Sequence, residues 1–327
     1  MDSPSNIIET AFRLANAWAG PATRLWPFYL LTMIGMCYLL FRRSLSVKSF
    51  FQWAFPVDVY FHKSHFVDIK LFLFSRILAL LGLFNTVAIT AFMASGLMTF
   101  LAESNAPEAA LHPALIALLM VLVNDFGVYW VHRIHHEIKT LWPFHAVHHS
   151  AEVLTPVTTY RKHPLYDIFS SSSRGVVMGL LEGVLLGLFV GKVEFTTIAG
   201  INAGYALFNL LGSNLRHTHI WLSYGRVLEH LFISPAQHQI HHSLDHKHYN
   251  TNYGEIFAIW DWMFGTLYVP QSREELQFGL SDAEGKRIEQ PHDSLTNALV
   301  VPIQDSLKSF RGNSAEAKNV TSEATRP

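Results

Sequence analysis

The sequence predicts an all-α fold: a multi-span bundle of membrane helices that carries a histidine-rich helical cap on its cytoplasmic side. Three observations support this prediction. Half of the 327 residues are hydrophobic and 15% are charged, whereas soluble proteins carry about 25% charged residues. The apolar residues gather in runs of a length suited to membrane helices. Of the 19 histidines, 15 lie between residues 132 and 248, mostly just after these runs.

Composition also excludes several classes of protein. A net charge of −1 leaves no basic face for nucleic acid, so we expect no nucleic-acid partner. The single cysteine, Cys37, excludes a disulfide framework. The abundance of aromatic and aliphatic residues excludes disorder over most of the chain.

The first segment, residues 1–70, is expected to lie in or on the membrane. Apolar residues recur at helical spacing over residues 8–18, which is compatible with a helix in the membrane interface or with a frayed terminus. The apolar run Trp26–Phe41 is shorter than the ~20 residues that cross a bilayer. We therefore expect this run to cross steeply or to form a re-entrant helix.

The main membrane domain is expected over residues 71–270, with spans at His112–Val131, Val176–Val190 and Phe195–Leu211. The apolar run Leu71–Leu101 is long enough to form a further span with a tilt or a kink. The last two spans should form a hairpin about residues 191–194. Glycine at every fourth position from 175 to 191 predicts close packing of one helix on a neighbour. Glu182, within this stripe, is expected to bond a neighbouring helix. Residues 271–327 are expected to form a polar C-terminal tail whose last fifteen residues are disordered.

The distribution of basic residues predicts the orientation in the membrane. Ten lysines and arginines lie in residues 42–70 and 132–175, and the loops of the other side hold only Lys192. Basic loops remain on the cytoplasmic side, so every histidine cluster should face the cytoplasm. This predicts a multi-pass integral membrane protein, in the plasma membrane of a bacterium or the endoplasmic reticulum of a eukaryote.

Three short segments share one arrangement of histidines, at positions i, i+3 and i+4. This spacing places three side chains on one face of a helix. Chance alone would give roughly 0.06 such triplets in a chain of this histidine content. The triplets are His132, His135 and His136; His145, His148 and His149; and His238, His241 and His242.

The number of these histidines indicates how many metal ions they bind. Imidazole is the commonest neutral metal ligand. One zinc ion takes four protein ligands, or three at a catalytic site, so nine histidines exceed the need of one metal and fit two. No triplet contains Asp or Glu. A dinuclear site dominated by histidine is therefore expected.

Further candidates lie near the triplets. His217 and His219 alternate, so in an extended segment they would share one face. Asp125 is an ionisable residue near the end of an apolar span, which marks it as functional, and we expect it to orient a histidine of another triplet. The remaining candidates, as metal ligands or as groups that orient a ligand, are His135, His163, His248 and Glu152.

Over residues 75–270 the pattern resembles the fatty acid hydroxylase superfamily, the integral-membrane di-iron enzymes that include the sterol desaturases. The resemblance implies that the first triplet binds metal through its outer histidines. Many members have a histidine two residues before an Asn-Leu-Arg stretch, where this chain has Gly212, so that ligand role is carried over to His217 and His219. The motifs are Asn124-Asp-Phe-x-x-Tyr-Trp-x-His132-Arg-x-x-His136, His145-x-x-His148-His149-Ser, Arg161-x-His163-Pro, Ser234-Pro-x-x-His238-x-x-His241-His242-Ser and Trp260-Asp-x-x-Phe264-Gly-Thr-Leu-Tyr268.

The resemblance also implies a reaction. Two iron ions would use O2 to hydroxylate or desaturate a C–H bond of a lipid or sterol, and the histidines alone do not separate these two outcomes. The sequence has no dinucleotide fingerprint, flavin motif or cysteine set for an iron–sulfur cluster. We therefore expect electrons from a separate donor, a ferredoxin or a cytochrome b5 with its reductase. The donor is expected to dock near Arg161, Lys162, Arg216 and Arg226.

Two other functions are compatible with the histidines. A zinc-dependent membrane hydrolase is one, although the H-E-x-x-H motif that would supply its base is absent. A non-enzymatic membrane protein that binds or transports metal is the other. Transport would place the ligands near the bilayer midplane, whereas these histidines follow the ends of the spans.

Overall fold

The computed structural model describes residues 15–16, 18–21, 23–41, 47–82, 86–102, 111–189, 195–282 and 285–312. In this part of the chain strand-like pairing is limited to isolated bridges such as that of Phe232 with Phe257, so the all-α prediction is confirmed. The long helices are α2 (Pro27–Leu40), α5 (Lys63–Leu80), α6 (Thr86–Ala102), α7 (Pro113–Glu137), α9 (Pro164–Phe189), α10 (Phe195–Leu210) and α13 (Leu295–Phe310). The shorter α-helices are α3 (Val47–Ala54), α4 (Val57–Tyr60), α8 (Trp142–His149), α11 (Pro235–His241) and α12 (Ile259–Met263). The 3-10 helices are η1 (Pro156–Tyr160), η2 (Ser213–His217), η3 (Leu228–His230) and η4 (His246–His248).

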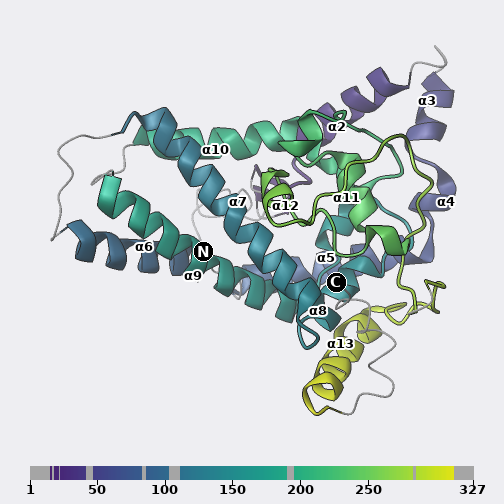
Figure 1. The fold of residues 1–327 in the computed structure, drawn as a ribbon. Coiled ribbons are helices and arrows are strands. Elements are labelled where there is room, and N and C mark those ends of the chain that lie inside the picture. Colours follow the sequence, from purple (N-terminus) through teal and green to yellow (C-terminus); the bar gives the residue numbers. More distant parts are fainter. Residues whose placement is uncertain are drawn as a thin grey trace, which may run out of the picture.

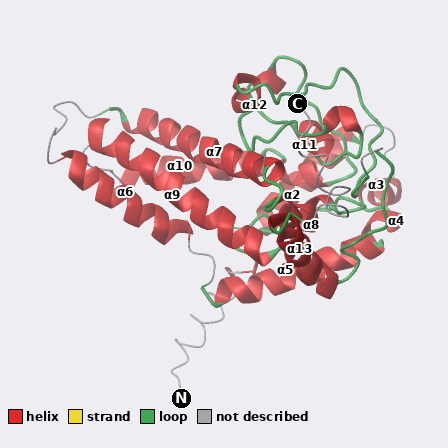
Figure 2. Cartoon of the chain, turned by 60° about the horizontal axis from the view of Figure 1, so that its bottom comes forward, coloured by secondary structure: helices red, strands yellow, loops and turns green. Residues whose placement is uncertain are grey.

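Four long helices, α6, α7, α9 and α10, extend away from a compact region that holds most of the shorter elements (Figures 1 and 2). α6 packs along α9, α9 on α7, and α7 on α10. A Cβ atom added at Gly179 would lie 2.7 Å from the carbonyl oxygen of Thr90, and one at Gly183 would lie 3.1 Å from that of Ala94. The glycine stripe therefore lets α9 and α6 touch backbone to backbone, as predicted.

One of the predicted spans has the dimensions of a membrane helix in the structure. Among the described residues, α7 alone is both long and apolar enough to cross a bilayer. α2 and the stretch Ile89–Leu101 are apolar but shorter. Asn124 of α7 donates a hydrogen bond of 2.8 Å to Glu182 of α9, so the predicted bond from Glu182 to a neighbouring helix is confirmed.

Two features of the predicted bundle are wrong. The single span expected over Leu71–Leu101 is divided, because α5 ends at Leu80 and Gly82 follows with a φ of +75°, which glycine adopts without steric cost. The expected hairpin of the last two spans is not a packed pair. α9 packs chiefly on α6 and α7, whereas α10 packs chiefly on α7; residues 190–194 lie outside the described residues.

Arg161 connects several elements of the compact region. Its buried guanidinium forms an ion pair of 2.8 Å with Asp68 of α5, which is equally buried. Other N–H groups of Arg161 donate to the carbonyl oxygen of Val147 in α8, the hydroxyl of Ser150 and the carbonyl oxygen of His292. One side chain therefore joins α5, α8 and the C-terminal segment.

The polar C-terminal segment contains a helix that sequence analysis did not predict. α13 begins after Ser294, whose side chain accepts a hydrogen bond from the backbone N–H of Asn297. Ala298 packs with Val67 and Val147, which places α13 against α5 and α8. The predicted disorder of residues 313–327 lies outside the described residues, as does most of the helix expected over residues 8–18.

Candidate metal centre

Nine histidines converge from four elements in the compact region. Their ring nitrogens fall into two groups, and the candidate ligand atoms within each group lie within 4.8 Å of one another. Group A comes from α7, α8 and α11, and group B from α8, η2, and α11 with its C-cap. Group A is His132, His136, His145, His149 and His241, and group B is His148, His217, His238 and His242.

The spacing within each triplet divides the histidines between the groups. Residues four apart join the same group, as His145 and His149 do in group A and His238 and His242 in group B. The other histidine of each of these triplets joins the opposite group. Adjacent helical residues diverge by about 100°, so the i+3 and i+4 positions of one helix can face different centres. α8 and α11 therefore lie between the two groups and supply both.

Distances within the groups match those of ligands around a metal ion. In group A, the Nε2 atom of His145 lies 3.0 Å from that of His132 and 3.2 Å from that of His149. In group B, the Nε2 atom of His217 lies 3.1–3.3 Å from the Nε2 atoms of the other three histidines. With metal–nitrogen bonds of about 2.1 Å, two neighbouring ligands are about 3.0 Å apart in an octahedron and about 3.4 Å in a tetrahedron.

The chemistry of the donor set also fits metal ions. Buried polar atoms normally have hydrogen-bond partners, yet the Nε2 atoms of His136 and His241 are buried and have none among the described residues. Burial, followed by neighbouring imidazoles, lowers the pKa of His241 and of His242 to about 3. The rings are therefore neutral at pH 7, the form that binds metal. Neither group contains a carboxylate, which favours metals that accept imidazole ligands.

Oxygen atoms on the outer side of three rings fix their orientation. The Nδ1–H group of His132 donates to the carbonyl oxygen of Tyr253 at 2.8 Å, and that of His241 to the carbonyl oxygen of Thr251 at 2.8 Å. The Nδ1 atom of His217 lies 3.0 Å from the Thr159 hydroxyl. Each contact occupies Nδ1 and leaves Nε2 facing the group, as is usual for histidines that bind metal.

Two residues with left-handed backbone conformations precede the carbonyl groups of Thr251 and Tyr253 and help to orient them toward the histidines. Asn250 and Asn252 both have a φ of +57°, a left-handed conformation that asparagine tolerates better than most residues. The Asn252 side chain donates to the Gln237 carbonyl and accepts from the Tyr268 N–H. Residues 251–253 are therefore held at the edge of group A.

Asp125 holds the next part of this segment. It accepts hydrogen bonds from the backbone N–H groups of Ile256 and Phe257 and from the Trp260 indole. None of these contacts is with a histidine, so the expectation that Asp125 orients a histidine of another triplet through a hydrogen bond is wrong. Asp125 instead ties α7 to the segment that follows Tyr253, the residue whose carbonyl oxygen accepts from His132. His132 is also on α7, so this tie helps to keep the ring and its carbonyl partner together.

Asp261 performs a similar role that sequence reasoning missed. Its carboxylate accepts from the N–H groups of Tyr253 and Gly254. A Cβ atom at Gly254 would lie 2.4 Å from the Phe257 carbonyl oxygen and 2.9 Å from the carboxylate, so only glycine fits there. The Trp260-Asp261 motif was the available sequence signal for this role.

Five of the predicted candidates lie outside both groups and have other partners. The ring nitrogens of His219, His163 and His135 contact the backbone oxygens of Trp53, Leu299 and Val131. His248 contacts Glu274, and Glu152 pairs with Arg287. The expected docking of an electron donor on Arg161 and Arg216 is also wrong, because their side chains are buried.

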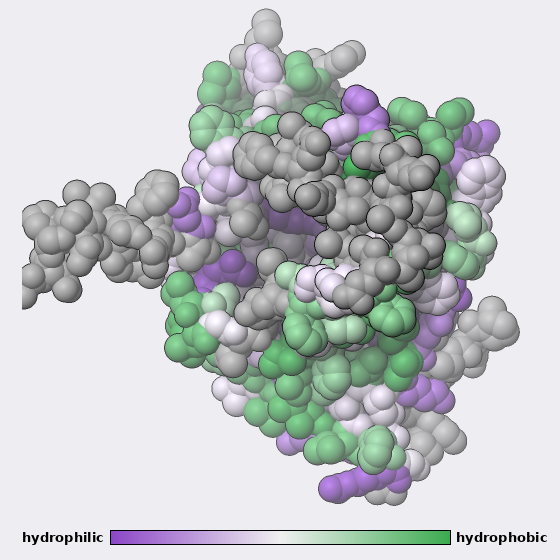
Figure 3. All heavy atoms as spheres, turned by 90° about the vertical axis from the view of Figure 1, so that its left-hand side faces the viewer, coloured by the Kyte–Doolittle hydropathy of each residue, from purple (hydrophilic) through white to green (hydrophobic). Residues whose placement is uncertain are grey.

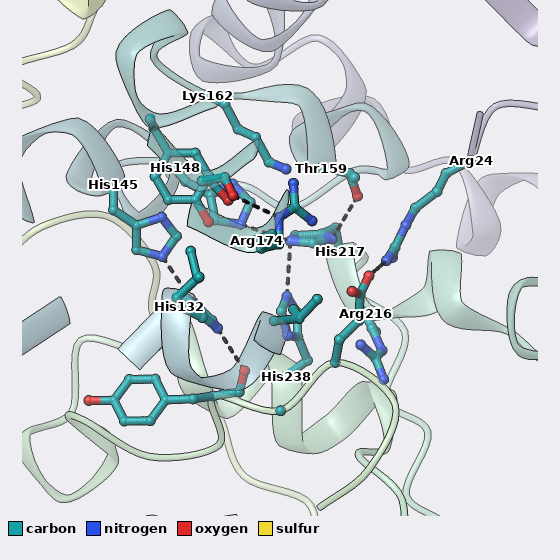
Figure 4. A pocket seen from close by; sticks show the side chains of 17 residues that line it. Arg24, His132, His145, His148, Thr159, Lys162, Arg174, Arg216, His217 and His238 are labelled. Atoms are coloured by element: carbon teal, nitrogen blue, oxygen red, sulfur yellow. Dashed lines mark hydrogen bonds and ion pairs between the residues drawn. The ribbon is translucent and has the colours of Figure 1, made fainter. Parts of the chain in front are cut away.

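Two cavities reach the histidines from different sides. One cavity of about 120 Å³ borders His132, His145, His148, His217 and His238 (Figure 4). Its wall also carries charged side chains, and we call it the charged cavity. A second cavity of about 60 Å³ borders His136, His149, His241 and His242. Both groups are therefore accessible to small molecules.

Residues 117–266 match the family model described as fatty acid hydroxylase. The resemblance inferred from the histidine motifs is thereby confirmed. The matched region contains all nine histidines of groups A and B.

Three relatives illustrate the range of the family. The chain is 31% identical to an ornithine lipid hydroxylase of Rhizobium tropici over 53% of this chain and 48% of that protein. It is 29% identical to human alkylglycerol monooxygenase over 48% of this chain and 31% of that protein. It is 29% identical to a Delta(7)-sterol-C5(6)-desaturase of Nicotiana tabacum over 48% of this chain and 51% of that protein. The chain thus spans about half or less of these relatives. No solved structure matches it significantly.

Proposed function

We propose that this chain is a membrane-bound di-iron oxidoreductase that uses O2 to hydroxylate or desaturate a C–H bond of a lipid or sterol. The observation that carries the proposal is the pair of histidine groups, each with Nε2 atoms at the mutual spacing of metal ligands. The relatives described above are named as a hydroxylase, a monooxygenase and a desaturase. None of those names supports a zinc hydrolase or a metal transporter.

The residues of the chain have separate parts in this proposal. Groups A and B would each hold one iron ion, and the bound irons would supply O2 activation and removal of a hydrogen atom from an unactivated C–H bond. The Nδ1 atoms of three ligand rings are held by oxygen atoms outside the groups, which belong to Tyr253, Thr251 and Thr159. Asp125 and Asp261 act as positioning residues because they hold the 253–261 segment in place.

An apolar groove supports a lipid or sterol substrate. It has a volume of about 720 Å³ and runs between α7 and α10, where Val121 and Phe208 form part of its wall. Ile256 and Phe257 also border it, and they directly follow Glu255 of the charged cavity. A hydrophobic molecule could therefore lie beside the segment that contacts group A.

The arrangement in the membrane and the supply of electrons are further parts of the proposal. We place residues 71–270 as the multi-pass catalytic domain, residues 1–70 as a membrane or interfacial segment and residues 271–327 as a C-terminal segment on the cytoplasmic side. The histidine groups would then face the cytoplasm, in reach of a ferredoxin or cytochrome b5 with its reductase.

The test compares two neighbouring histidines. His217 belongs to group B, whereas the Nε2 atom of His219 lies 2.8 Å from the Trp53 carbonyl oxygen. We expect the purified wild-type protein to bind two iron ions and to oxidise a lipid when O2 and electrons are supplied. His217→Gln should lose iron and turnover. His219→Gln should keep both, because glutamine can still donate to Trp53.

Iron analysis and turnover separate the competing outcomes. Zinc in place of iron, with lipid hydrolysis, would support the hydrolase. Loosely bound metal without any turnover would support a binding or transport protein. Full iron content in His217→Gln would contradict the assignment of group B.

A further inference from the structure

The charged cavity has an unusual lining for a site beside a hydrophobic substrate. Four cationic side chains and one carboxylate surround it, together with group B histidines (Figure 4). These charged residues are Arg24, Lys162, Arg174, Arg216 and Glu255. Cations inside a protein are costly unless an opposite charge compensates for them, so the partner of each one indicates the role of the cavity.

Two of the cations have partners within the fold. Arg24 forms an ion pair with Glu255. Arg216 is buried, donates to the carbonyl oxygen of Ile233 at 2.9 Å and lies over the ring of Phe208. These contacts give Arg24 and Arg216 a structural explanation.

The other two cations have no ion-pair partner in the described part of the chain. The Lys162 ammonium lies 5.7 Å from the centre of the Tyr166 ring. Arg174 donates through Nε to the Ser170 carbonyl, one turn earlier in α9. Burial lowers the pKa of Lys162, and Asp167 and then Glu255 raise it. Glu255 is paired with Arg24, and among the described residues neither acid forms an ion pair with Lys162 or Arg174.

Lys162 and Arg174 lie close to group B. Figure 4 shows Lys162 extending toward Arg174, with His148 and His217 nearby. Both cations line the cavity that His148 and His217 also border. The two side chains therefore share one cavity with candidate iron ligands.

We propose that Lys162 and Arg174 bind the acidic group of the substrate, which is a lipid with an anionic head group, phosphate or carboxylate, rather than a neutral sterol. This inference rests on the proposed function, because it takes the charged cavity as part of the substrate site. Glu255 is the single carboxylate beside the four cations in the lining of the cavity, and the acidic group would add an anion in direct contact with Lys162 and Arg174. Guanidinium and ammonium groups are the common partners of phosphate and carboxylate in proteins.

Apolar surface for the chains of such a lipid lies next to the charged cavity. The apolar groove between α7 and α10 is bordered by Ile256 and Phe257, which directly follow Glu255 of the charged cavity. Figure 3 shows hydrophobic residues gathered on the lower part of the described surface of one face of the molecule.

Binding of two lipids with identical chains tests the proposal without iron or O2. Purified protein in a neutral detergent is titrated with dioleoyl phosphatidate, which is anionic, and dioleoylglycerol, which is neutral. We expect at least about tenfold tighter binding of phosphatidate. Lys162→Met combined with Arg174→Met should reduce the difference below about threefold. Lys308→Met, at an exposed lysine on α13, is the matched control and should keep the full preference.

Inorganic phosphate is the third ligand in the test. If it displaces phosphatidate at similar concentrations, the cavity binds free phosphate and the lipid assignment is overturned; weak competition supports a lipid. Equal binding of the two lipids, or a preference retained by the double variant when circular dichroism shows it folded, would also overturn the proposal. Because no turnover is measured, a clear charge preference in a protein that oxidises no lipid would refute the proposed function alone.

Discussion

The hydroxyl of Thr159 fixes the orientation of the His217 ring from outside group B. We therefore expect removal of this hydroxyl to weaken metal binding at group B and to leave group A unchanged. In Thr159→Val the Nδ1–H group loses its partner at 3.0 Å. Loss of such an orienting contact costs about 10–100-fold in metal affinity. At limiting iron, the iron content should fall from two toward one per chain, as measured by elemental analysis.

Thr140→Val is the matched control, because the Thr140 side chain lies outside both groups. It should bind iron as the wild type does. If Thr159→Val retains two irons with unchanged affinity, the hydroxyl does not orient His217.

The sequence predicted most of the histidines that converge, but it did not predict how they are divided between groups A and B. The i, i+3, i+4 spacing identified eight of the nine grouped histidines, with His135 set apart only by the resemblance. It could not separate His217 from His219, because the sequence analysis assumed an extended segment. η2 instead ends at His217, and Thr218 is extended with φ of −149°, so the two rings point to different partners. The carbonyl partners of His132 and His241 depend on backbone conformation, which residue types alone do not encode.

The ion pair of Arg161 and Asp68 determines how α5 and α8 are held together. In Arg161→Met the buried carboxylate of Asp68 remains without its counter-charge. Breaking a buried ion pair from one side costs about 3–5 kcal/mol. Thermal unfolding in detergent should therefore show a large fall in Tm.

Arg287→Met provides the comparison for this loss. Arg287 pairs with Glu152, but its side chain is 42% exposed, and exposed pairs contribute about 0–1 kcal/mol. Its Tm should change little. A similar change in both variants would show that burial does not strengthen the Arg161 pair.

Acid sensitivity of the C-terminal segment is expected from His292. Burial, followed by the charge of Arg161, lowers the pKa of His292 to about 3, whereas it is about 6.5 in the unfolded chain. Between these values only the unfolded state binds the proton, so stability falls as the pH falls below about 6.5. From pH 6.5 to pH 5 the loss is about 2 kcal/mol.

His292→Leu should remove this part of the acid sensitivity. The difference in Tm between pH 7 and pH 5 should be smaller in the variant than in the wild type. An unchanged difference would show that other groups account for the acid sensitivity.

Helix positions were predicted correctly where an apolar run in the sequence coincides with one helix. α2 and α10 lie within one or two residues of the predicted apolar runs, and α7 contains the predicted span His112–Val131 apart from its cap. The division of α5 from α6 was missed because the apolar run continues through Gly82. α13 was missed because its polar composition resembles a tail, while its stability depends on contacts with Val67 and Val147.

The orientation of the whole molecule in the membrane can be tested with single cysteines. Ser223→Cys and Lys139→Cys introduce exposed thiols in the compact region, whereas the native Cys37 is buried. The basic loops predict that both positions react with impermeant reagents from the cytoplasmic side. Glu103→Cys, in the loop expected on the other side, should react only from that side. Labelling of all three from one side would contradict the proposed topology.

In our proposal the protein depends on an external donor for its electrons. O2 activation at two irons consumes two electrons in each turnover. The 327 residues contain one cysteine and no dinucleotide-binding motif, so no iron–sulfur cluster or nicotinamide site is expected within them. Iron-loaded protein with NADPH and lipid should therefore remain inactive.

Addition of a ferredoxin or a cytochrome b5, together with its reductase, should start turnover, measured as oxidised lipid by mass spectrometry. The rate should fall as salt increases if an acidic carrier docks on a basic surface. Arg161 and Arg216 are buried, and Lys162 lines the charged cavity. The docking surface must therefore use other cations, and the exposed Arg226 is the remaining one of the four first considered. Arg226→Glu should slow reduction by the carrier without changing iron content. Full activity with NADPH alone would show that the chain holds a cofactor site of its own.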